Sequence, residues 1–321
     1  MKILVTGGAG FIGSHLCERL IKDGHCVTAI DDFSTGRASN LANLNGSKDF
    51  ILVEGSILDT NVLKPLIDDT DYVFHLAAAV GVFNIVNNPL ASLLTNIRGT
   101  ENVLEAAHAT KTPVFLTSSS EVYGKNISDS LKESDDRILG SPITLRWSYS
   151  EAKAIDESLA YAYFIENQLE TRIVRFFNTV GPRQLGAYGM VVPRFVKAAL
   201  ANEPITIYGS GNQTRCFAHV YDVVDAVIEV AFAENTMGKV INIGNNFEIS
   251  INDLAKKIIG ETNSMSEIIY VPYEEAYGDG FEDMERRVPN IDLINQLVSW
   301  KPKRDLSTMI TDISAEMKKG T

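Results

Sequence analysis

Tyr149 and Lys153 are the two residues in this 321-residue sequence whose types and spacing are best suited to chemistry. They open a segment with a helical pattern, and a separation of four residues places both side chains on one face of a helix. A phenol with a pKa near ~10 is a poor base at neutral pH. A lysine ammonium one turn away, together with a positively charged ring nearby, would favour the phenolate. The pair then suits removal of a proton from a hydroxyl group while hydride leaves the same carbon.

The Tyr-x-x-x-Lys pattern occurs once in the chain, after the predicted strand Val114–Thr117 and the serine-rich turn that follows it. This context favours a catalytic role. The alternative interpretation is an ordinary pair of side chains on the surface of a helix.

The first twenty residues predict a site for a pyrophosphate group. A short apolar run at Ile3–Val5 indicates a buried strand, and a helical pattern runs from Ser14 to about Ile21. Glycines in the turn between them let backbone approach a pyrophosphate, whose charge the N-terminus of a helix attracts. A glycine-rich turn without a ligand is the alternative. The residues expected to bind the dinucleotide here are Gly7, Gly10, Phe11, Ile12 and Gly13.

A second predicted strand, Cys26–Ile30, ends in Asp31 and Asp32. Asp31 lies 18 residues beyond Gly13, near the ~20 expected of the acid that binds the adenosine ribose. A carboxylate at that position repels a 2′-phosphate, so the sequence predicts NAD rather than NADP. Arg37 could still accommodate a phosphate, and two loop aspartates could simply cap a turn.

The composition excludes several classes of protein. Hydrophobic residues make up 45% of the chain and charged residues 22%, as in ordinary globular proteins. A net charge of −12 without a basic block argues against a nucleic-acid partner. No apolar run approaches the ~18 residues of a membrane span, and the first strand begins too early to leave room for a signal peptide. The five histidines lack the spacing of metal ligands.

The three cysteines, Cys17, Cys26 and Cys216, are expected to be buried thiols in a reducing compartment. We therefore expect a cytoplasmic protein that contains no metal and has neither a membrane nor a nucleic-acid partner.

Strands and helices alternate along the first half of the chain, which predicts a parallel sheet covered on both faces. The predicted strands are 3–5, 26–30, 50–53, 72–76, 114–117 and 171–177, and the predicted helices are 14–21, 61–67, 90–109 and 149–166. His75 is expected to be a core histidine whose polar atoms are satisfied. The small residues Ala77–Ala79, after the fourth strand, would let a flat ligand lie against backbone.

The regular alternation of predicted strands and helices ends after Asn178. Helices are predicted at 192–201, 223–232 and 250–259, and strands at 205–208, 239–243 and 268–271. The expected fold is α/β, a Rossmann-type doubly wound parallel sheet with a smaller C-terminal substrate-binding lobe. Residues 1–177 would form the NAD-binding domain, with 217–245 returning to it through the strand at 239–243. Residues 178–216 and 246–321 would form the lobe.

Taken together, Thr6–Gly13, Asp31, Ser119 and the Tyr149/Lys153 pair resemble the extended short-chain dehydrogenase/reductase family. Within it the chain is similar to the nucleotide-sugar epimerases, dehydratases and decarboxylases. The resemblance covers nearly all of the chain and includes three further motifs: Asn96–Thr100, Asn178 with Gly181–Arg183, and Arg215–Asp222. It implies NAD as cofactor, a UDP-sugar as substrate, and a homodimer formed through the helices 90–109 and 149–166.

The resemblance also implies further site residues. Those expected at the cofactor are Ser56, Ile57, Leu76, Ala77, Ala78 and Asn96, with Tyr149 and Lys153. Those expected at the nucleotide sugar are Asn178, Val192, Tyr208, Arg215 and Arg287. Many relatives carry an aspartate where this chain has Ser56, so contacts to adenine would differ. Arg287 could instead form an ion pair within the acidic segment Glu282–Glu285.

Ser119, Ser120 and Glu121 bear on the reaction. By resemblance, Ser119 would hydrogen-bond the sugar hydroxyl that is oxidised. A carboxylate such as Glu121 is useful where a proton is handled at the neighbouring C5, unless it turns away to bond the loop. Ser-Glu here resembles the UDP-glucuronate decarboxylases and also the GDP-mannose dehydratases. The favoured interpretation is the first, which implies C4 oxidation and decarboxylation of UDP-glucuronate to UDP-xylose or its 4-keto precursor. The alternatives are a UDP-sugar 4-epimerase, acting on glucose, N-acetylglucosamine or glucuronate, a 4,6-dehydratase and a non-enzymatic binding module.

Overall fold

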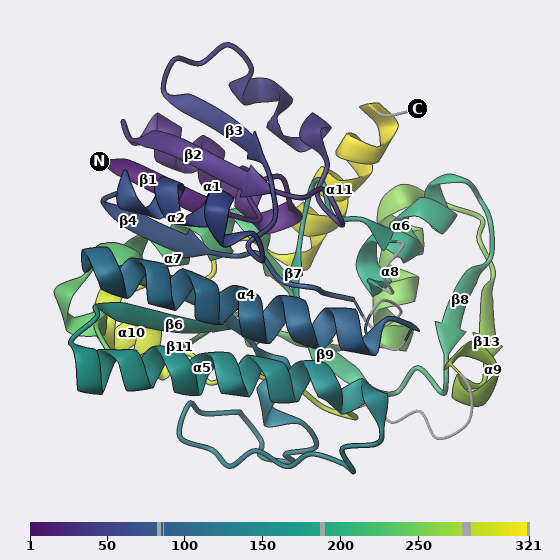
Figure 1. The fold of residues 1–321 in the computed structure, drawn as a ribbon. Coiled ribbons are helices and arrows are strands. Elements are labelled where there is room, and N and C mark those ends of the chain that lie inside the picture. The colour runs from purple at the N-terminus through teal and green to yellow at the C-terminus, as the bar shows by residue number, and fades with distance from the viewer. Residues whose placement is uncertain (82–84, 86, 187–189, 278–283, 320–321) are drawn as a thin grey trace.

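The computed structural model describes residues 1–81, 85, 87–186, 190–277 and 284–319. Its centre is a parallel sheet of seven strands, ordered β11-β6-β5-β4-β1-β2-β3 (Figure 1). The strands are β1 (Lys2–Thr6), β2 (Cys26–Asp31), β3 (Phe50–Glu54), β4 (Tyr72–His75), β5 (Val114–Ser119), β6 (Thr171–Phe176) and β11 (Val240–Ile243). The predicted doubly wound α/β fold is confirmed, and the predicted strand at 239–243 does join this sheet, beside β6.

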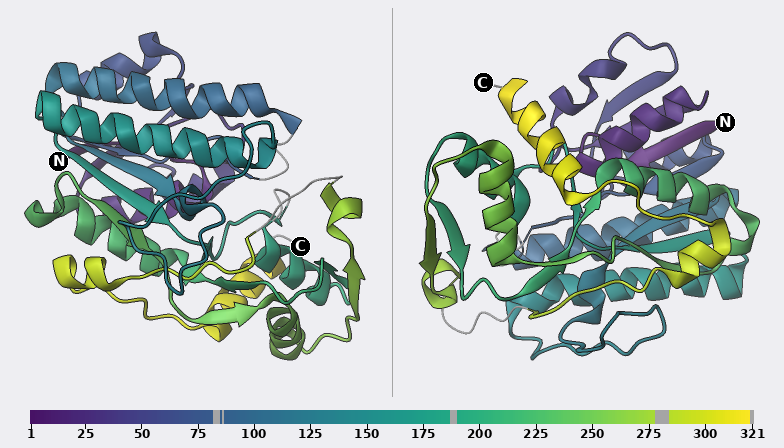
Figure 2. Two further views of the ribbon diagram at one scale, coloured as in Figure 1. Left: turned by 90° about the horizontal axis from the view of Figure 1, so that it is seen from below. Right: turned by 180° about the vertical axis from the view of Figure 1, so that it is seen from behind.

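Helices cover both faces of the sheet (Figures 1 and 2). One face carries α2 (Thr60–Asp68), α4 (Pro89–Thr110) and α5 (Ser148–Asn167), and the other carries α1 (Phe11–Lys22), α7 (Val220–Phe232) and α10 (Asp292–Val298). Successive side chains of a strand point to opposite faces. Accordingly Ile3 and Val5 pack in the core beneath α1 and α7, while Leu4 packs in the core beneath α4 and α5.

The strand order reverses between β1 and β4. Thr6, the last residue of β1, pairs with Ile30 of β2 on one side and with His75 of β4 on the other. The connections from these two strands leave in opposite directions, and a crevice therefore opens at their carboxyl ends, where α/β sheets bind ligands.

The C-terminal part has a hydrophobic core of its own beside that crevice. Its helices are α6 (Val191–Leu200), α8 (Ile251–Thr262), α9 (Tyr273–Tyr277) and α11 (Leu306–Lys319). Its two-stranded sheets pair β8 (Ile205–Tyr208) with β13 (Ile268–Val271) in parallel, and β9 (Thr214–Cys216) with β12 (Glu248–Ser250) in antiparallel fashion. A third short pair joins β7 (Thr179–Val180) to β10 (Ala218–His219). The 3₁₀ segments include η1 (Ala38–Leu44), η2 (Ser120–Tyr123), η3 (Leu145–Trp147) and η5 (Glu234–Thr236).

The structure changes one expectation about the cysteines. Cys17 and Cys216 are buried as predicted, whereas Cys26 is exposed. Cys26 opens β2 at the end of the sheet opposite the crevice, where the first residue of a strand is not covered by a helix. Among the described residues no helix combines the length and the apolar character that crossing a bilayer requires. No group of three or more metal-ligating side chains is gathered among those residues either.

Candidate active site

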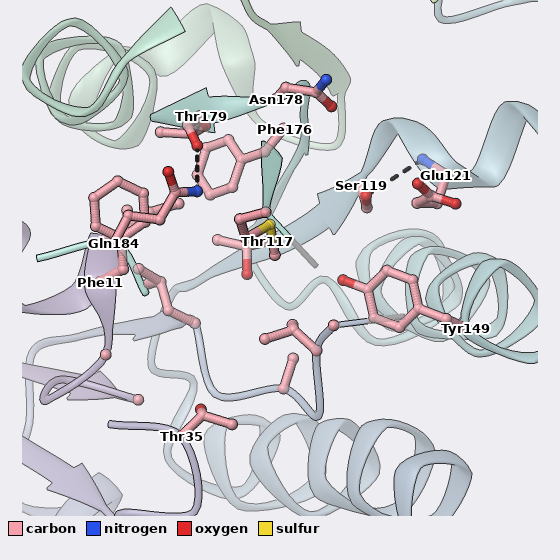
Figure 3. Close-up of a pocket in the computed structure, with 18 of the residues that line it drawn as sticks. Phe11, Thr35, Thr117, Ser119, Glu121, Tyr149, Phe176, Asn178, Thr179 and Gln184 are labelled. Carbon is pink, nitrogen blue, oxygen red and sulfur yellow. Dashed lines mark hydrogen bonds between the residues drawn. The ribbon is translucent and has the colours of Figure 1, made fainter. Parts of the chain in front are cut away.

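A cavity of about 490 Å³ lies at the carboxyl ends of the central strands (Figure 3). Its wall combines the glycine turn after β1, the ends of β2, β4, β5 and β6, the first turns of α5, and parts of the C-terminal core. Every site residue predicted from the sequence lines this cavity except Asn96. Asn96 lies behind the wall, where its side-chain oxygen accepts the Ala79 N–H at 2.8 Å. It bonds the loop after β4 and is not among the residues that line the cavity.

The glycine turn packs too tightly for side chains at two of its positions. Gly7 has φ of +71°, and a Cβ on Gly13 would lie 2.2 Å from the Gly7 carbonyl oxygen. The absence of side chains brings α1 against the end of β1. Because α1 starts at Phe11, its first turn lines the cavity with backbone N–H groups that have no acceptor within the helix. A cradle of this kind fits the pyrophosphate of a dinucleotide.

Asp31 both caps a turn and faces the cavity, so the two interpretations of this residue are compatible. Its Oδ2 accepts the Ala9 N–H at 2.9 Å, and its Oδ1 accepts the Phe33 N–H at 2.9 Å. Burial raises the pKa of Asp31, and the backbone donors oppose that shift. The neighbouring Asp32 is exposed and accepts the Ser34 N–H. A carboxylate fixed at the end of β2 fits ribose hydroxyls and disfavours a phosphate.

Tyr149 lies in the first turn of α5, and its hydroxyl points into the cavity (Figure 3). Burial raises the pKa of the Tyr149 phenol, whereas the Lys153 ammonium and the Ser119 hydroxyl lower it. Burial is the largest of these effects, so the protein by itself does not make the phenol more acidic than a free tyrosine. The lysine expected from the spacing does lower the pKa of Tyr149, but the desolvation that outweighs it depends on tertiary packing.

Lys153 is itself buried, with 2% of its side chain exposed. Its Nζ donates to the Thr117 carbonyl oxygen at 3.1 Å and to Asp156 Oδ2 at 3.1 Å. Asp156 was not among the predicted site residues, although an acid three residues after Lys153 lies on the same face of the helix.

Glu121 forms ion pairs with two arginines from distant parts of the chain. Its Oε1 lies 2.5 Å from Nη1 of Arg287, and its Oε2 lies 2.6 Å from Nη1 of Arg146. Arg287 also donates to the side-chain oxygen of Asn178 at 3.0 Å. The two guanidinium groups hold the pKa of Glu121 well below its usual range despite burial. The side chain is not turned away into the loop; its backbone N–H bonds the Ser119 hydroxyl (Figure 3).

The C-terminal core contributes a basic wall to the same cavity. Arg215 lies there as predicted, with its Nη1 donating to the Thr214 carbonyl. Arg194 was not predicted, although it is a lone charge on the apolar first turns of α6. Its guanidinium stacks over the Tyr208 ring, 4.1 Å from the ring centroid. Two guanidinium groups and an aromatic ring in one wall suit a nucleoside diphosphate.

Comparison with known proteins agrees with this geometry. Residues 3–244 match the model of the NAD dependent epimerase/dehydratase family. The UDP-N-acetyl-alpha-D-glucosaminuronate decarboxylase of Bacillus cytotoxicus is 42% identical over 302 residues, which cover 94% of this chain and 92% of that protein. UDP-glucuronic acid decarboxylase 1 of Xenopus tropicalis is 37% identical over 94% of this chain and 68% of its own.

Among solved structures, UDP-glucuronic acid 4-epimerase from Bacillus cereus, in complex with UDP-glucuronic acid and NAD, is similar with a TM-score of 0.90. It is 30% identical, and the match covers all of both chains. The family model spans most of this chain and the relatives match it nearly end to end. The chain therefore belongs to the NAD dependent epimerase/dehydratase family, and NAD is its cofactor.

Proposed function

We propose that the protein is an NAD-dependent decarboxylase of a UDP-linked uronate, with UDP-glucuronate converted to UDP-xylose or its 4-keto precursor. The observation that carries the proposal is the Glu121 carboxylate between Arg146 and Arg287, beside Tyr149. The three charged groups leave one net positive charge at the sugar end of the cavity, which favours a sugar that carries a carboxylate. The relatives named as uronate decarboxylases support the same class of substrate.

The cofactor would lie along the glycine turn, with its adenosine ribose at Asp31 and its nicotinamide near Lys153 and Tyr149. The remaining contacts would come from Ser56, Ile57 and the segment Leu76–Ala78, all of which line the cavity. Bound NAD⁺ supplies the hydride acceptor for C4, and its positive charge adds to the effect of Lys153 on the phenol.

Tyr149 is the base that takes the proton of the 4-hydroxyl group, which Ser119 holds by a hydrogen bond. Loss of that proton and of hydride converts C4 into a ketone, which is β to the C6 carboxylate. The electrons of the C5–C6 bond then move into the ketone, CO₂ leaves, and an enolate remains. A proton returns to C5. In forming UDP-xylose, C4 regains its hydride from the cofactor while Tyr149 returns its proton to the C4 oxygen.

Glu121 can serve these steps in a specific way. Because two guanidinium groups keep it ionised, it is a poor proton donor while both pairs are intact. Glu121 partly neutralises the two arginines. The arginines then still attract the C6 carboxylate of the substrate, but they do not stabilise it so strongly that loss of CO₂ is prevented. We place Ser120 and Glu121 at C5 for the return of the proton. Once Arg287 has moved to the substrate, Glu121 can take up a proton from water and pass it to C5.

The C-terminal part would hold the nucleotide. Among the residues that line the cavity, Asn178, Val192, Tyr208 and Arg215 come from the chain beyond β6. We assign residues 178–216 and 246–321 to this substrate lobe, and residues 1–177 with 217–245 to the NAD-binding domain. The junction between the two would form the sugar site.

The protein is also proposed to be a cytoplasmic homodimer. α4 and α5 pack side by side on one face of the sheet (Figure 1). They expose apolar side chains, among them Leu90, Ile155, Tyr161 and Ile165. Pairing these helices with the same helices of a second copy would bury those side chains in a four-helix bundle. The three free thiols suit a reducing compartment.

One incubation tests the reaction. The holoenzyme is given UDP-glucuronate, UDP-N-acetylglucosaminuronate, UDP-glucose or UDP-N-acetylglucosamine, and each product is weighed by mass spectrometry. The mass of a uronate substrate should fall by one CO₂ if C4 is reduced again before release, and by one CO₂ and two hydrogens if the 4-keto sugar is released. A change of configuration at C4 without a change of mass would establish the second candidate, a 4-epimerase, which is favoured by the similarity to a UDP-glucuronic acid 4-epimerase. Loss of one water from UDP-glucose would indicate a dehydratase.

A further inference from the structure

A buried ion pair lies directly behind the tyrosine of the proposed active site. Lys153 and Asp156 have side-chain exposures of 2% and 0%, and Nζ and Oδ2 are 3.1 Å apart. The same ammonium donates to the Thr117 carbonyl oxygen, which fixes its direction. A lysine that is buried without a negative partner loses its proton readily, because burial penalises the charged form. Asp156 is therefore in position to decide whether Lys153 carries its charge.

A chain of buried hydrogen bonds runs from the end of β1 to Thr100, which lies beside Asp156. The Thr6 hydroxyl accepts the Ala77 N–H at 3.1 Å and bonds His75 Nδ1 at 2.8 Å. His75 Nε2 in turn bonds the Thr100 hydroxyl at 3.0 Å. Burial raises the pKa of the Asp156 carboxyl group, and the Lys153 ammonium and the nearby Thr100 hydroxyl oppose that shift. Thr6, His75 and Thr100 are all at most 1% exposed.

One direction of proton donation lets this chain support the carboxylate. Burial lowers the pKa of His75 to about 3, so the ring is neutral and carries one N–H. If Thr6 donates to Nδ1, the ring donates from Nε2 to Thr100, whose O–H is then free to face Asp156. In the opposite direction Thr100 would donate its proton to Nε2 of His75, and no proton of Thr100 would face the Asp156 carboxylate. We assign the first direction on this ground.

We propose that Asp156 is a positioning residue, held by His75 and Thr100, that keeps Lys153 charged so that Lys153 can support ionisation of Tyr149. The proposal rests on the roles that the proposed function gives to Tyr149 and Lys153. It is independent of whether CO₂ leaves the product.

The other charged groups around the pair are accounted for. Glu157 of α5 faces Lys153 as well, but Arg175 of β6 binds it with two hydrogen bonds, at 2.9 and 2.7 Å. From η2, Glu121 acts on Tyr149 and is itself paired with two arginines. From β4, His75 is neutral, and α4 contributes the uncharged Thr100. Asp156 is thus the acid in direct contact with the ammonium.

The direction in which Asp156→Asn shifts the Tyr149 titration distinguishes a role through Lys153 from a direct effect of the Asp156 charge on Tyr149. By its own charge, Asp156 raises the pKa of Tyr149. If that were its whole effect, Asp156→Asn would move the Tyr149 titration to lower pH. If Asp156 acts through Lys153, the same substitution discharges the lysine, and the titration moves to higher pH. Asparagine keeps an oxygen to accept the Lys153 hydrogen bond, so the variant changes charge with little change of shape.

The experiment is a titration of NAD-loaded protein followed by the near-ultraviolet absorbance of phenolate. The signal of Tyr149 in the parent is obtained by subtracting the spectrum of Tyr149→Phe. Its signal in Asp156→Asn is obtained by subtracting the spectrum of the variant that carries both substitutions. We expect the Tyr149 midpoint to rise by about one pH unit or more, as loss of a charge at a buried site produces. The acid limb of the pH dependence of C4 oxidation, measured as reduced cofactor formed, should move with it.

Thr100→Val keeps the shape of the side chain and removes the hydroxyl between His75 and Asp156. It should move the midpoint in the same direction by a smaller amount. The controls are Glu166→Gln, which removes an exposed charge from the same helix, and Thr110→Val on α4, at an exposed position. Neither control should move the midpoint.

A lower midpoint in Asp156→Asn would overturn the proposal, and so would an unchanged midpoint in a folded variant. A product other than a decarboxylated sugar would refute the proposed function while leaving this titration intact.

Discussion

Arg287 and Glu121 are 166 residues apart in the chain, yet Nη1 of the first lies 2.5 Å from Oε1 of the second. Arg287 lies before α10 in the C-terminal part of the chain, and Glu121 lies in η2, directly after the central strand β5. The contact therefore joins the C-terminal part of the chain to the turn that carries Ser119 and Ser120. Arg146 completes the group from the residues just before α5.

Glu121→Gln should destabilise the protein, because it leaves two buried guanidinium groups without their carboxylate. Breaking a buried pair costs about 3–5 kcal/mol, and access of water to the cavity should place this variant near the lower end. Urea unfolding at neutral pH measures the loss. Glu166→Gln, at an exposed position, should be nearly neutral.

The same variant has a predicted pH dependence of stability. The folded-state pKa of Glu121 lies below its ordinary value of 4.5. Its contribution is therefore complete above that value and is lost as the pH falls through the folded-state pKa. The difference in unfolding free energy between parent and variant should shrink on acidification. Parallel curves at all pH values would show that Glu121 is not held ionised by its arginines.

Glu121→Ala should slow CO₂ release more than it slows C4 oxidation, because the carboxylate is proposed to act at C5 and C6. Reduced cofactor formed in a single turnover measures the oxidation, and labelled CO₂ from the C6 carboxyl group measures the second step. Equal loss of both rates would point to a carboxylate that only holds the arginines in place.

Tyr149→Phe should lower turnover by about 10²–10⁴-fold, the usual contribution of a positioned acid or base. Bound NAD should be retained, because the phenol is not part of the glycine turn. Cofactor released on denaturation reports NAD content, and steady-state assays report turnover. Unchanged turnover would remove Tyr149 from the chemistry.

Gly13→Ala should weaken cofactor binding and destabilise the fold by roughly 1–3 kcal/mol, as overpacking does. Its Cβ would lie 2.2 Å from the Gly7 carbonyl, which is backbone and cannot turn away. Gly260→Ala is the matched control, because Gly260 is also helical and a Cβ there meets nothing within 4 Å. That change should stabilise by about 0.5–1 kcal/mol. Similar losses in both variants would refute the steric argument.

Ile165→Glu should produce a monomer if α4 and α5 form the proposed dimer contact. Ile165 is 56% exposed on α5, so a charge there is tolerated by a single copy but not within an apolar interface. Sedimentation velocity measures the mass of parent and variant. Met265→Glu, at a position 85% exposed and outside these helices, should leave the mass unchanged. A parent that sediments as a monomer would contradict the homodimer.

The sheet and the glycine turn could be predicted because their signals are local. Each of the six N-terminal strands is marked by a short apolar run between turn residues. The boundaries were less accurate. β5 extends to Ser119 because Ser118 and Ser119 pair with Arg175 and Phe176 of β6, a tertiary contact that outweighs the low strand propensity of serine.

The helix starts show the same limit. α7 begins three residues earlier than predicted, at Val220, because the His219 side chain accepts the Tyr221 N–H as an N-cap. Histidine is not a common residue for that role. The sequence also carries a helical pattern for α11, which was not among the predicted helices. Its apolar residues Leu306, Met309, Ile310 and Ile313 have helical spacing, and all four are buried.

The charged contacts of the site could not be predicted from local sequence patterns. The types of Glu121 and Arg287 suggested a sugar site, but their mutual contact depends on the path of the C-terminal segment. Asp156 was missed for a different reason. An acid near a lysine on a helix is usually a surface pair, and only the packing of α4 against α5 buries this one.

The position of β11 at the edge of the central sheet has a consequence for biosynthesis. β6 is the neighbour of β11 and is complete at Phe176, but its outer edge stays open until Ile243 has been made. A ribosome must therefore deliver the chain as far as β11 before the central sheet can be completed. Nascent chains arrested before that residue should expose an unpaired strand edge and be recruited by chaperones.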